Sequence, residues 1–304
     1  MKTALHSVSY AGVWPGQARL SLEDFLQRAK TLGFPAVMLM AKRPHLSVLD
    51  YDVQARQGLR QRLEQLGLKV ACLAGYTDFC LGSERPDIPS REMQILYVRE
   101  LCRLARDLDC GLIRVFTGFD YPGLSLDQQW GWCITSLREC ARQAAGFGVT
   151  IAIQNHHDTA CHHEALLELL QEIAEPNCKV MFDAWAHAPV ERVPGGYRQD
   201  GNDLVAAVKK LAPYIVHTTV ADYVHRPRYR YQPNLVNYLR EPDALRAVPM
   251  GEGFIDYKSF FKALKEIGYD GYVAYEMCSY LRGGGSEENL ERYARKFLDY
   301  MTAF

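Results

Sequence analysis

The sequence carries almost no net charge, and this absence narrows the kinds of partner to expect. Its 35 Lys and Arg residues are balanced by 36 Asp and Glu residues, the formal net charge is −1, and the two signs are interspersed along the chain. Proteins that bind nucleic acid or anionic membrane surfaces usually gather basic residues on one face or in one segment. We therefore expect no nucleic acid and no membrane as a partner, and we favour a small molecule.

Long apolar runs are also missing. No stretch approaches the ~18 consecutive apolar residues of a membrane-spanning helix. The first residues, with His6, Ser7 and Ser9, interrupt the apolar core that a signal peptide needs. The nine cysteines are an odd number for a disulfide framework, and several lie within apolar runs, where free cysteine packs as a small hydrophobic residue. We expect no membrane or targeting segment, and a reducing, cytoplasmic location.

A glycine-rich dinucleotide-binding loop is the third absence, because residues 9–16 contain no Gly-x-Gly-x-x-Gly pattern. The chain instead alternates short apolar runs, typical of buried parallel strands, with segments whose apolar positions recur at helical spacing. Eight such cycles predict an α/β fold, a (β/α)8 TIM barrel, with residues 1–304 forming a single domain. The strands are expected at Thr3–Ser9, Ala36–Ala41, Lys69–Ala74, Leu112–Thr117, Thr150–Asn155, Lys179–Asp183, Ile215–Val220 and Tyr272–Met277. The helices are expected at Leu22–Leu32, Gln54–Leu66, Met93–Leu108, Leu126–Phe147, His163–Ile173, Asp203–Leu211, Tyr257–Ile267 and Glu288–Met301.

Four residues with metal-ligand chemistry lie at or near the ends of expected strands: Gln154, Asp183, His217 and Glu276. No two share a strand, and TIM-barrel enzymes carry their active sites at the C-terminal ends of the strands. Two carboxylates, an imidazole and a carboxamide oxygen suit a divalent metal ion. We expect these four residues to bind one such ion, Mn²⁺ before Mg²⁺, Co²⁺ or Zn²⁺. A ketose carbonyl and a neighbouring hydroxyl would chelate the ion, which would stabilise an enediolate.

These residues lie within longer patterned segments: Ile153–His156, Met181–Asp183, Val216–Asp222, Pro249–Asp256 and Tyr275–Gly285. Together with the eightfold alternation, they resemble the xylose isomerase-like barrels, which include sugar phosphate isomerases and epimerases, ketose 3-epimerases, inosose dehydratases and endonuclease IV. The resemblance covers nearly the whole chain. In that family a strand-five Glu, a strand-six Asp, a strand-seven His or Gln and a strand-eight Glu hold the metal. The resemblance therefore implies that Asp183, His217 and Glu276 are ligands.

Gln154 departs from the family pattern, which has a glutamate at this position. Epimerases of the family use the strand-five and strand-eight glutamates as two opposed bases, and a carboxamide cannot take a proton. Glu276 is then one base, and His156 or His157 is the nearest substitute for the other. An unperturbed imidazole titrates near pH ~6.5, which suits this role at neutral pH. In the alternative, one-base reaction, proton abstraction is followed by loss of a β-substituent.

Further polar residues have two interpretations. Arg114 lies in the middle of an expected strand, where it could contact substrate or pair with a neighbouring carboxylate. Glu252, between two glycines, is expected to have a structural role at a tight turn. The longest stretch between elements, Ala221–Gly253, is rich in Tyr, Arg and Pro. We expect it to fold over the barrel mouth as a substrate loop, because long loops of compact domains are usually functional.

The resemblance implies a divalent-metal-dependent isomerase or epimerase that acts on a ketose or keto-sugar, phosphorylated or not, through an enediolate. Gln154 favours an alternative, a lyase or dehydratase acting on a 3-keto-glycoside or cyclitol, including C-glycoside deglycosidase-like activity. A DNA-repair endonuclease would need more strand-end ligands and a basic face. A metal-free binding barrel stays open because of Gln154. The expected partner is a small-molecule carbohydrate, and related barrels often form homo-oligomers, either dimers or tetramers.

Overall fold

Eight parallel strands form a closed barrel in the computed structural model, which describes the chain except for residues 83–84, 86, 186–189, 194–195 and 200–203. The barrel strands are β1 (Lys2–His6), β2 (Ala36–Met40), β3 (Lys69–Ala74), β4 (Leu112–Val115), β5 (Thr150–Gln154), β6 (Cys178–Asp183), β9 (Ile215–Val220) and β12 (Tyr272–Tyr275). Their order around the barrel is β1-β12-β9-β6-β5-β4-β3-β2. The closed order confirms the predicted TIM barrel.

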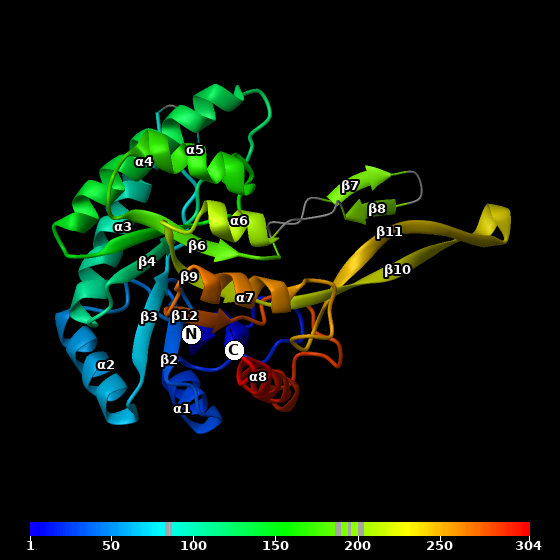
Figure 1. The fold of residues 1–304 in the computed structure, drawn as a ribbon, viewed down its shortest axis with the longest axis horizontal. Coiled ribbons are helices and arrows are strands. Elements are labelled where there is room, and N and C mark those ends of the chain that lie inside the picture. The colour runs from blue at the N-terminus through cyan, green and yellow to red at the C-terminus, as the bar shows by residue number, and fades with distance from the viewer. Residues whose placement is uncertain (83–84, 86, 186–189, 194–195, 200–203) are drawn as a thin grey trace.

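The helices lie around the outside of the barrel (Figure 1). They are α1 (Leu22–Leu32), α2 (Val53–Leu66), α3 (Ser90–Asp107), α4 (Leu126–Ala145), α5 (His163–Ile173), α6 (Leu204–Lys210), α7 (Tyr257–Glu266) and α8 (Glu287–Met301). Each agrees with the expected helix to within a few residues, although Asp203, the expected start of α6, lies outside the described residues. Short 3-10 turns occur at η1 (Ser7–Tyr10), η2 (Asp158–Ala160) and η3 (Pro233–Leu235).

Local signals explain where these helices start and stop. At the start of α1, the Ser21 hydroxyl accepts a hydrogen bond from the Asp24 backbone N–H at 3.1 Å, which satisfies one of the free donors of the first turn. At its end, Gly33 has φ of 92°, a left-handed conformation that costs glycine little.

Small side chains fill the barrel interior below the rim. A buried cluster there contains Ala4, Ala36, Ala152 and Ala274, together with Met38 and Met181. Because side chains of a strand point alternately to its two faces, the residues two positions after Ala152, Met181 and Ala274 also face inward. These residues are Gln154, Asp183 and Glu276. The strand period thus brings the predicted site residues to the same end of the barrel.

The segment expected to form a loop over the barrel mouth is largely a β-hairpin, so this expectation was wrong. Strands β10 (Asp222–Gln232) and β11 (Asn237–Val248) pair antiparallel and extend away from the barrel (Figure 1). Tyr, Val and Arg recur along the segment, and such side chains suit an extended strand. A second antiparallel hairpin, formed by β7 (Val190–Val193) and β8 (Gly196–Gln199), was not expected either.

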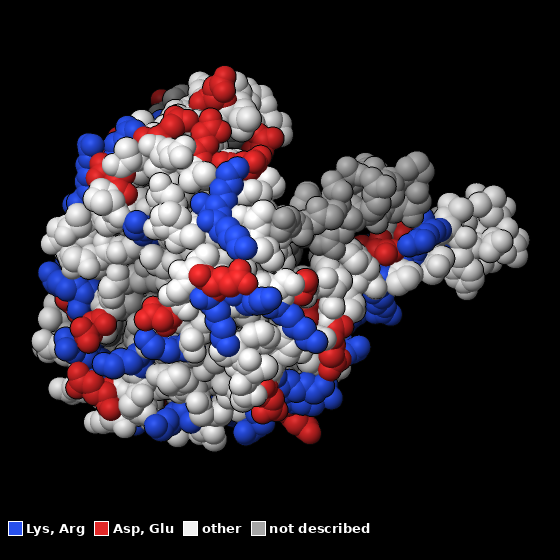
Figure 2. Space-filling view, in the orientation of Figure 1, with Lys and Arg blue, Asp and Glu red and all other residues white. Residues whose placement is uncertain are grey.

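The surface and the thiols agree with the composition. On the face shown in Figure 2, basic and acidic side chains are interspersed. All nine cysteines carry free thiols. Among the described residues, the helices are too short or too polar to cross a bilayer.

Candidate active site

Gln154 and Asp183 end neighbouring strands and are joined by a hydrogen bond. The Gln154 carboxamide Nε2 donates to Asp183 Oδ2 at 2.9 Å, and the Trp185 backbone N–H donates to Asp183 Oδ1 at 3.2 Å. Asn155 holds the main chain of Asp183, since its Nδ2 donates to the Asp183 carbonyl at 3.0 Å and its Oδ1 accepts from the Asp183 N–H at 2.7 Å. Both carboxylate oxygens of the fully buried Asp183 therefore already accept protein N–H groups.

His217 lies deeper in the barrel than Asp183. In the β6–β9 pairing, Asp183 is opposite Thr219, whereas His217 is opposite Met181. Two residues of a strand span about 6.6 Å, so the imidazole starts a full layer below the level of the Asp183 carboxylate. The residue of β9 at that level is Thr219, which is not among the predicted ligands. Both residues face the interior by the two-residue period, so only the pairing register distinguishes them.

Glu276 follows β12 and is held by backbone contacts at the rim. Its N–H donates to the Val220 carbonyl at 3.1 Å. The next residue, Met277, donates its N–H to the Ser9 hydroxyl at 3.0 Å and accepts at its carbonyl from Gln17 Nε2 at 2.8 Å. The end of β12 is therefore fixed to the turn that follows β1.

The Glu276 carboxyl is buried, with 9% of the residue exposed. Burial raises its pKa, while the positive charge of Arg114 and hydrogen bonds with Thr219 and Cys278 lower it, and burial outweighs them. A carboxylate of raised pKa is a stronger base, which suits it to remove a proton from carbon.

Arg114, on β4, places a guanidinium among aromatic rings beneath the rim. Its guanidinium carbon lies 3.9 Å from the ring centre of Phe116 and 4.6 Å from that of Tyr76. The residue is 3% exposed, and among the described residues its Nε and Nη1 have no hydrogen-bond partner. Burial raises the pKa of Tyr76 to about 12, against the effect of the Arg114 charge. Of the two interpretations of Arg114, pairing with a carboxylate does not account for Nε and Nη1, which the described residues leave unbonded.

His156 and His157 follow β5 and face the same aromatic cluster. The Phe116 ring centre lies 5.1 Å from that of His156 and 4.1 Å from that of His157. His156 is exposed at the rim, yet burial of its ring and the charge of Arg114 lower its pKa to about 4. Burial, His156 and Arg114 lower the pKa of His157 to about 3. Both imidazoles are thus neutral at pH 7 and weaker bases than the unperturbed imidazole that the sequence suggested.

Several buried polar atoms at this end of the barrel have no partner in the part of the chain that the structure describes. They are Nε and Nη1 of Arg114, Nε2 of His217, Nδ1 of His157 and Nε1 of Trp185. Such groups are costly to bury unless something satisfies them. A polar ligand that brings several oxygens would satisfy such groups.

The expected four-residue metal site does not assemble. Within the described ranges, no three His, Cys, Asp or Glu side chains gather as a metal-binding group. The Gln154 carboxamide directs its N–H toward Asp183, and the β9 residue at the level of Asp183 is a threonine. Nε2 of His217, unpartnered among the described residues, could bind a metal ion, but His217 lies a layer below Asp183. The donor set therefore does not fit the divalent centre expected from the sequence.

Comparison with known proteins places the chain in a family. The sequence model described as "xylose isomerase-like TIM barrel" matches residues 26–301. The chain belongs to this family. L-ribulose-5-phosphate 3-epimerase UlaE of Escherichia coli O157:H7 is 25% identical over 260 residues, which cover 84% of this chain and 81% of that protein. This similarity supports an isomerase or epimerase enzyme.

Two solved structures show the same fold at lower identity. The probable 3-DHS dehydratase AsbF of Bacillus anthracis superposes with a TM-score of 0.72 at 18% identity, over 99% of each chain. The IOLI protein, solved with a bound zinc atom, has a TM-score of 0.74 at 16% identity, over 100% of this chain and 99% of that one. A divalent metal therefore occurs in a protein of this fold.

Glu252 has the structural role expected of it. Its carboxylate forms an ion pair with Arg282 and another with Lys296, whose Nζ lies 2.7 Å from Oε1. The neighbouring Gly253 has no room for a side chain, because an added Cβ would lie 1.9 Å from Asp222 Oδ1. This segment is therefore a tight turn packed on the start of β10, and Glu252 is directed to α8.

Proposed function

We propose that this protein is an isomerase or epimerase that acts on a small ketose or keto-sugar through an enediolate. The observation that carries the proposal is the buried Glu276 carboxyl of raised pKa, at an end of the barrel where buried N–H donors of Arg114 and Trp185 have no partner among the described residues. A base beside donors for oxygen is the arrangement that proton abstraction next to a carbonyl requires. The similarity to a sugar phosphate epimerase supports the same class of substrate.

Glu276 performs the first step. Its carboxylate takes the proton from the carbon next to the substrate carbonyl, the C–H electron pair forms the new C=C bond, and the carbonyl oxygen becomes an oxyanion. The protonated Glu276 then returns the proton to the former carbonyl carbon, while the proton of the neighbouring hydroxyl moves to the oxyanion and leaves a new carbonyl, which isomerises the substrate. Epimerisation instead requires a proton to reach the opposite face of the original carbon. A second acid–base group on the other side of the substrate must deliver it.

His156 and His157 are the nearest candidates for this second role. Both are neutral at pH 7, since their pKa values are lowered to about 4 and about 3. A neutral imidazole of low pKa orients a hydroxyl well but transfers a proton poorly. We assign these residues to substrate positioning, with Gln154 and Asp183 forming the adjacent wall.

The low basicity of these imidazoles favours one alternative, a lyase or dehydratase. With Gln154 in place of a second glutamate, Glu276 is the single strong base, and the enediolate can collapse by expelling a hydroxyl or glycosyl group from the β-carbon. A 3-keto-glycoside or a cyclitol is the substrate class for this reaction. Metal dependence, Mn²⁺ as the preferred ion and a cytoplasmic location remain predictions from the sequence.

The test is proton NMR in D₂O with the purified protein and a panel of ketoses, ketose phosphates and 3-keto-glucosides. Deuterium entering next to the carbonyl with a new isomer or epimer would support the proposal, whereas loss of a β-substituent would select the lyase. The Glu276→Gln variant should lose about 10²–10⁴-fold in exchange rate, the usual contribution of a general base. Wild-type exchange in that variant, with its fold retained, would contradict the assignment of Glu276.

A further inference from the structure

We propose that Arg114 takes the place of a divalent metal ion in this site, its guanidinium holding the substrate carbonyl oxygen and stabilising the oxyanion formed there. The inference rests on the proposed function for the identity of that oxygen. It goes beyond that function because it assigns the positive charge of the reaction to a side chain, and it predicts that the native site has little affinity for metal.

The four strand ends offer few free ligands to a divalent ion. Gln154 brings no charge and gives its N–H to Asp183. Thr219 stands at the level where an imidazole would complete the set, and His217 lies two residues lower. A divalent ion would be left with two carboxylates, one of which already accepts N–H groups at both oxygens. Small hard cations need a fuller set of oxygen or nitrogen ligands than this.

Arg114 is a buried, charged residue with donors that the described residues do not use. A guanidinium remains charged at every working pH, and this one is almost fully buried with two donors unpartnered among the described residues. The rings of Phe116 and Tyr76 fix its position at 3.9 and 4.6 Å from their centres. A guanidinium held in one position presents N–H donors that match an oxyanion closely. The substrate oxygen therefore accepts the hydrogen bonds from Nε and Nη1 that no described residue accepts.

The Arg114 charge also lies beside the end of β5. Its guanidinium carbon is 3.9 Å from the ring centre of Phe116, and that ring centre lies 5.1 Å from the ring of His156 and 4.1 Å from the ring of His157. These histidines closely follow Gln154, so the guanidinium is near the place where a metal would have to bind. A divalent ion there would meet a permanent like charge in a poorly solvated site, which is strongly unfavourable.

The reaction balances without a further reagent. Glu276 removes the proton, the electron pair moves through the carbon framework to the carbonyl oxygen, and the resulting negative charge rests against Nε–H and Nη1–H of Arg114. Return of the proton from Glu276 to carbon restores both residues. No electron is gained or lost by the protein.

Metal affinity is measured first, because it needs no turnover. Mn²⁺ is titrated into the chelator-treated wild type and into the double variant Gln154→Glu/Thr219→His, and bound ion is followed by electron paramagnetic resonance. We expect weak, unsaturated binding in the wild type and binding tighter by roughly 100-fold or more in the double variant, since even outer partners of metal ligands are worth about 10–100-fold. One tightly held divalent ion per wild-type chain would overturn the proposal, whatever the substrate proves to be.

Deuterium exchange then tests Arg114 itself. Arg114→Lys and Arg114→Ala should each slow exchange by about 10²–10³-fold, the usual effect of losing an oxyanion donor, and EDTA should leave the wild type unchanged. Millimolar guanidinium should partly restore Arg114→Ala. Arg56→Lys is the matched control, a buried arginine of α2 whose guanidinium pairs with Asp107 of α3, and should exchange at the wild-type rate.

The outcomes separate the two proposals. Exchange that EDTA abolishes and Mn²⁺ restores in the wild type would overturn the role of Arg114 and leave the proposed function standing. Silence with every substrate would count against the proposed function, while the Mn²⁺ titration would still decide whether the site holds a metal. Full exchange in folded Arg114→Lys and Arg114→Ala would remove Arg114 from the reaction.

Discussion

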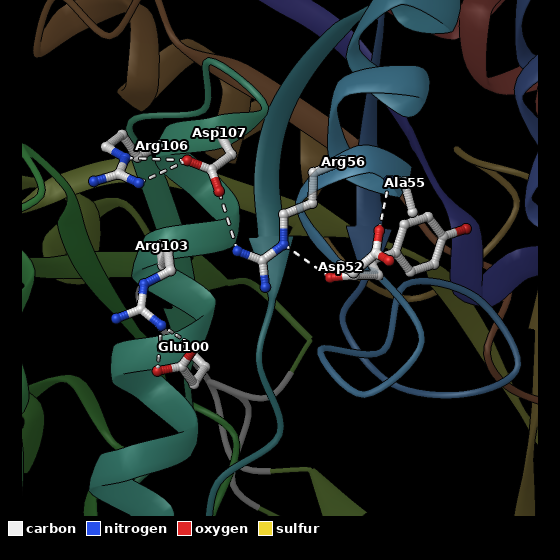
Figure 3. A network of polar contacts seen from close by, with 8 residues as sticks. Asp52, Ala55, Arg56, Glu100, Arg103, Arg106 and Asp107 are labelled. Atoms are coloured by element: carbon white, nitrogen blue, oxygen red, sulfur yellow. Dashed lines mark hydrogen bonds and ion pairs between the residues drawn. The ribbon is translucent and has the colours of Figure 1, made fainter.

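Arg56 and Arg114 are both buried arginines, 7% and 3% exposed, and they differ in what surrounds them. Arg56 donates from Nη1 to Asp107 Oδ2 at 3.0 Å and from Nε to the Tyr51 carbonyl at 2.9 Å, in the network of Figure 3. In Arg114 the corresponding Nε and Nη1 have no partner among the described residues. A buried charge with an anion beside it serves the fold, whereas one left with free donors is costly and needs another reason to be kept.

The positions of the two arginines explain the difference. Arg56 lies where α2 packs on α3, so an acidic residue of the neighbouring helix can reach it, and Asp107 does. Arg114 points into the barrel, where the rings of Phe116 and Tyr76 lie against its guanidinium. TIM barrels keep their chemistry at this end. A buried charge with unsatisfied donors at this end of the barrel is therefore expected of an active site that binds a polar ligand.

Removing the Arg114 charge gives the largest expected effect. Arg114→Met keeps much of the side-chain volume, and we expect turnover to fall by about 10²–10³-fold. We also expect the free energy of unfolding to rise by about 0.5–2 kcal/mol, because a buried group with unsatisfied donors is removed. Denaturant unfolding beside the exchange assay measures both. A variant that loses stability as well as turnover would show that Arg114 has a structural role similar to that of Arg56.

Removing the anion beside Arg56 gives the opposite pattern. Asp107→Asn leaves that guanidinium without its charge partner, and we expect a loss of about 1–3 kcal/mol in the free energy of unfolding, with turnover unchanged. Glu100→Gln is the matched control in the same network, since Glu100 pairs with Arg103, whose side chain is 43% exposed. Its loss should be within about 0.5 kcal/mol. Equal losses in the two variants would refute the distinction between buried and surface pairs.

The sequence was sufficient for the barrel but not for the register within it. Eight short apolar runs and their helices follow from local patterns, so the closed sheet was predictable. The choice between His217 and Thr219 was not, because both face inward on β9 and only the pairing with β6 places Thr219 opposite Asp183. The free donors of Arg114 were also beyond the sequence, since they depend on which side chains other strands bring beside it. Hairpin β10–β11 was missed because its polar strands lack an apolar run.

His157 provides the smallest test, one of pH dependence. Its ring lies between those of Phe116 and Phe119, with centres 4.1 and 4.0 Å away, and burial is the first cause of its lowered pKa, about 3. In the unfolded chain the pKa of this histidine is near ~6.5. Between pH ~3 and ~6.5 the unfolded chain therefore binds a proton at His157 and the folded chain does not. Stability is therefore fully present above pH ~6.5 and falls as the pH drops, by about 1.4 kcal/mol per pH unit for this group.

His157→Phe keeps the ring stack and removes this proton. Because the Nδ1 of His157 has no partner among the described residues, the substitution gives up no hydrogen bond at that atom. We expect the fall in unfolding free energy between pH 6.5 and 5 to become shallower by about 1 kcal/mol per unit, as measured by urea unfolding across that range. An unchanged slope would mean that His157 is protonated in the folded state near pH 6. The imidazole would then be a stronger base than its surroundings imply, which would restore it as the second base of an epimerase.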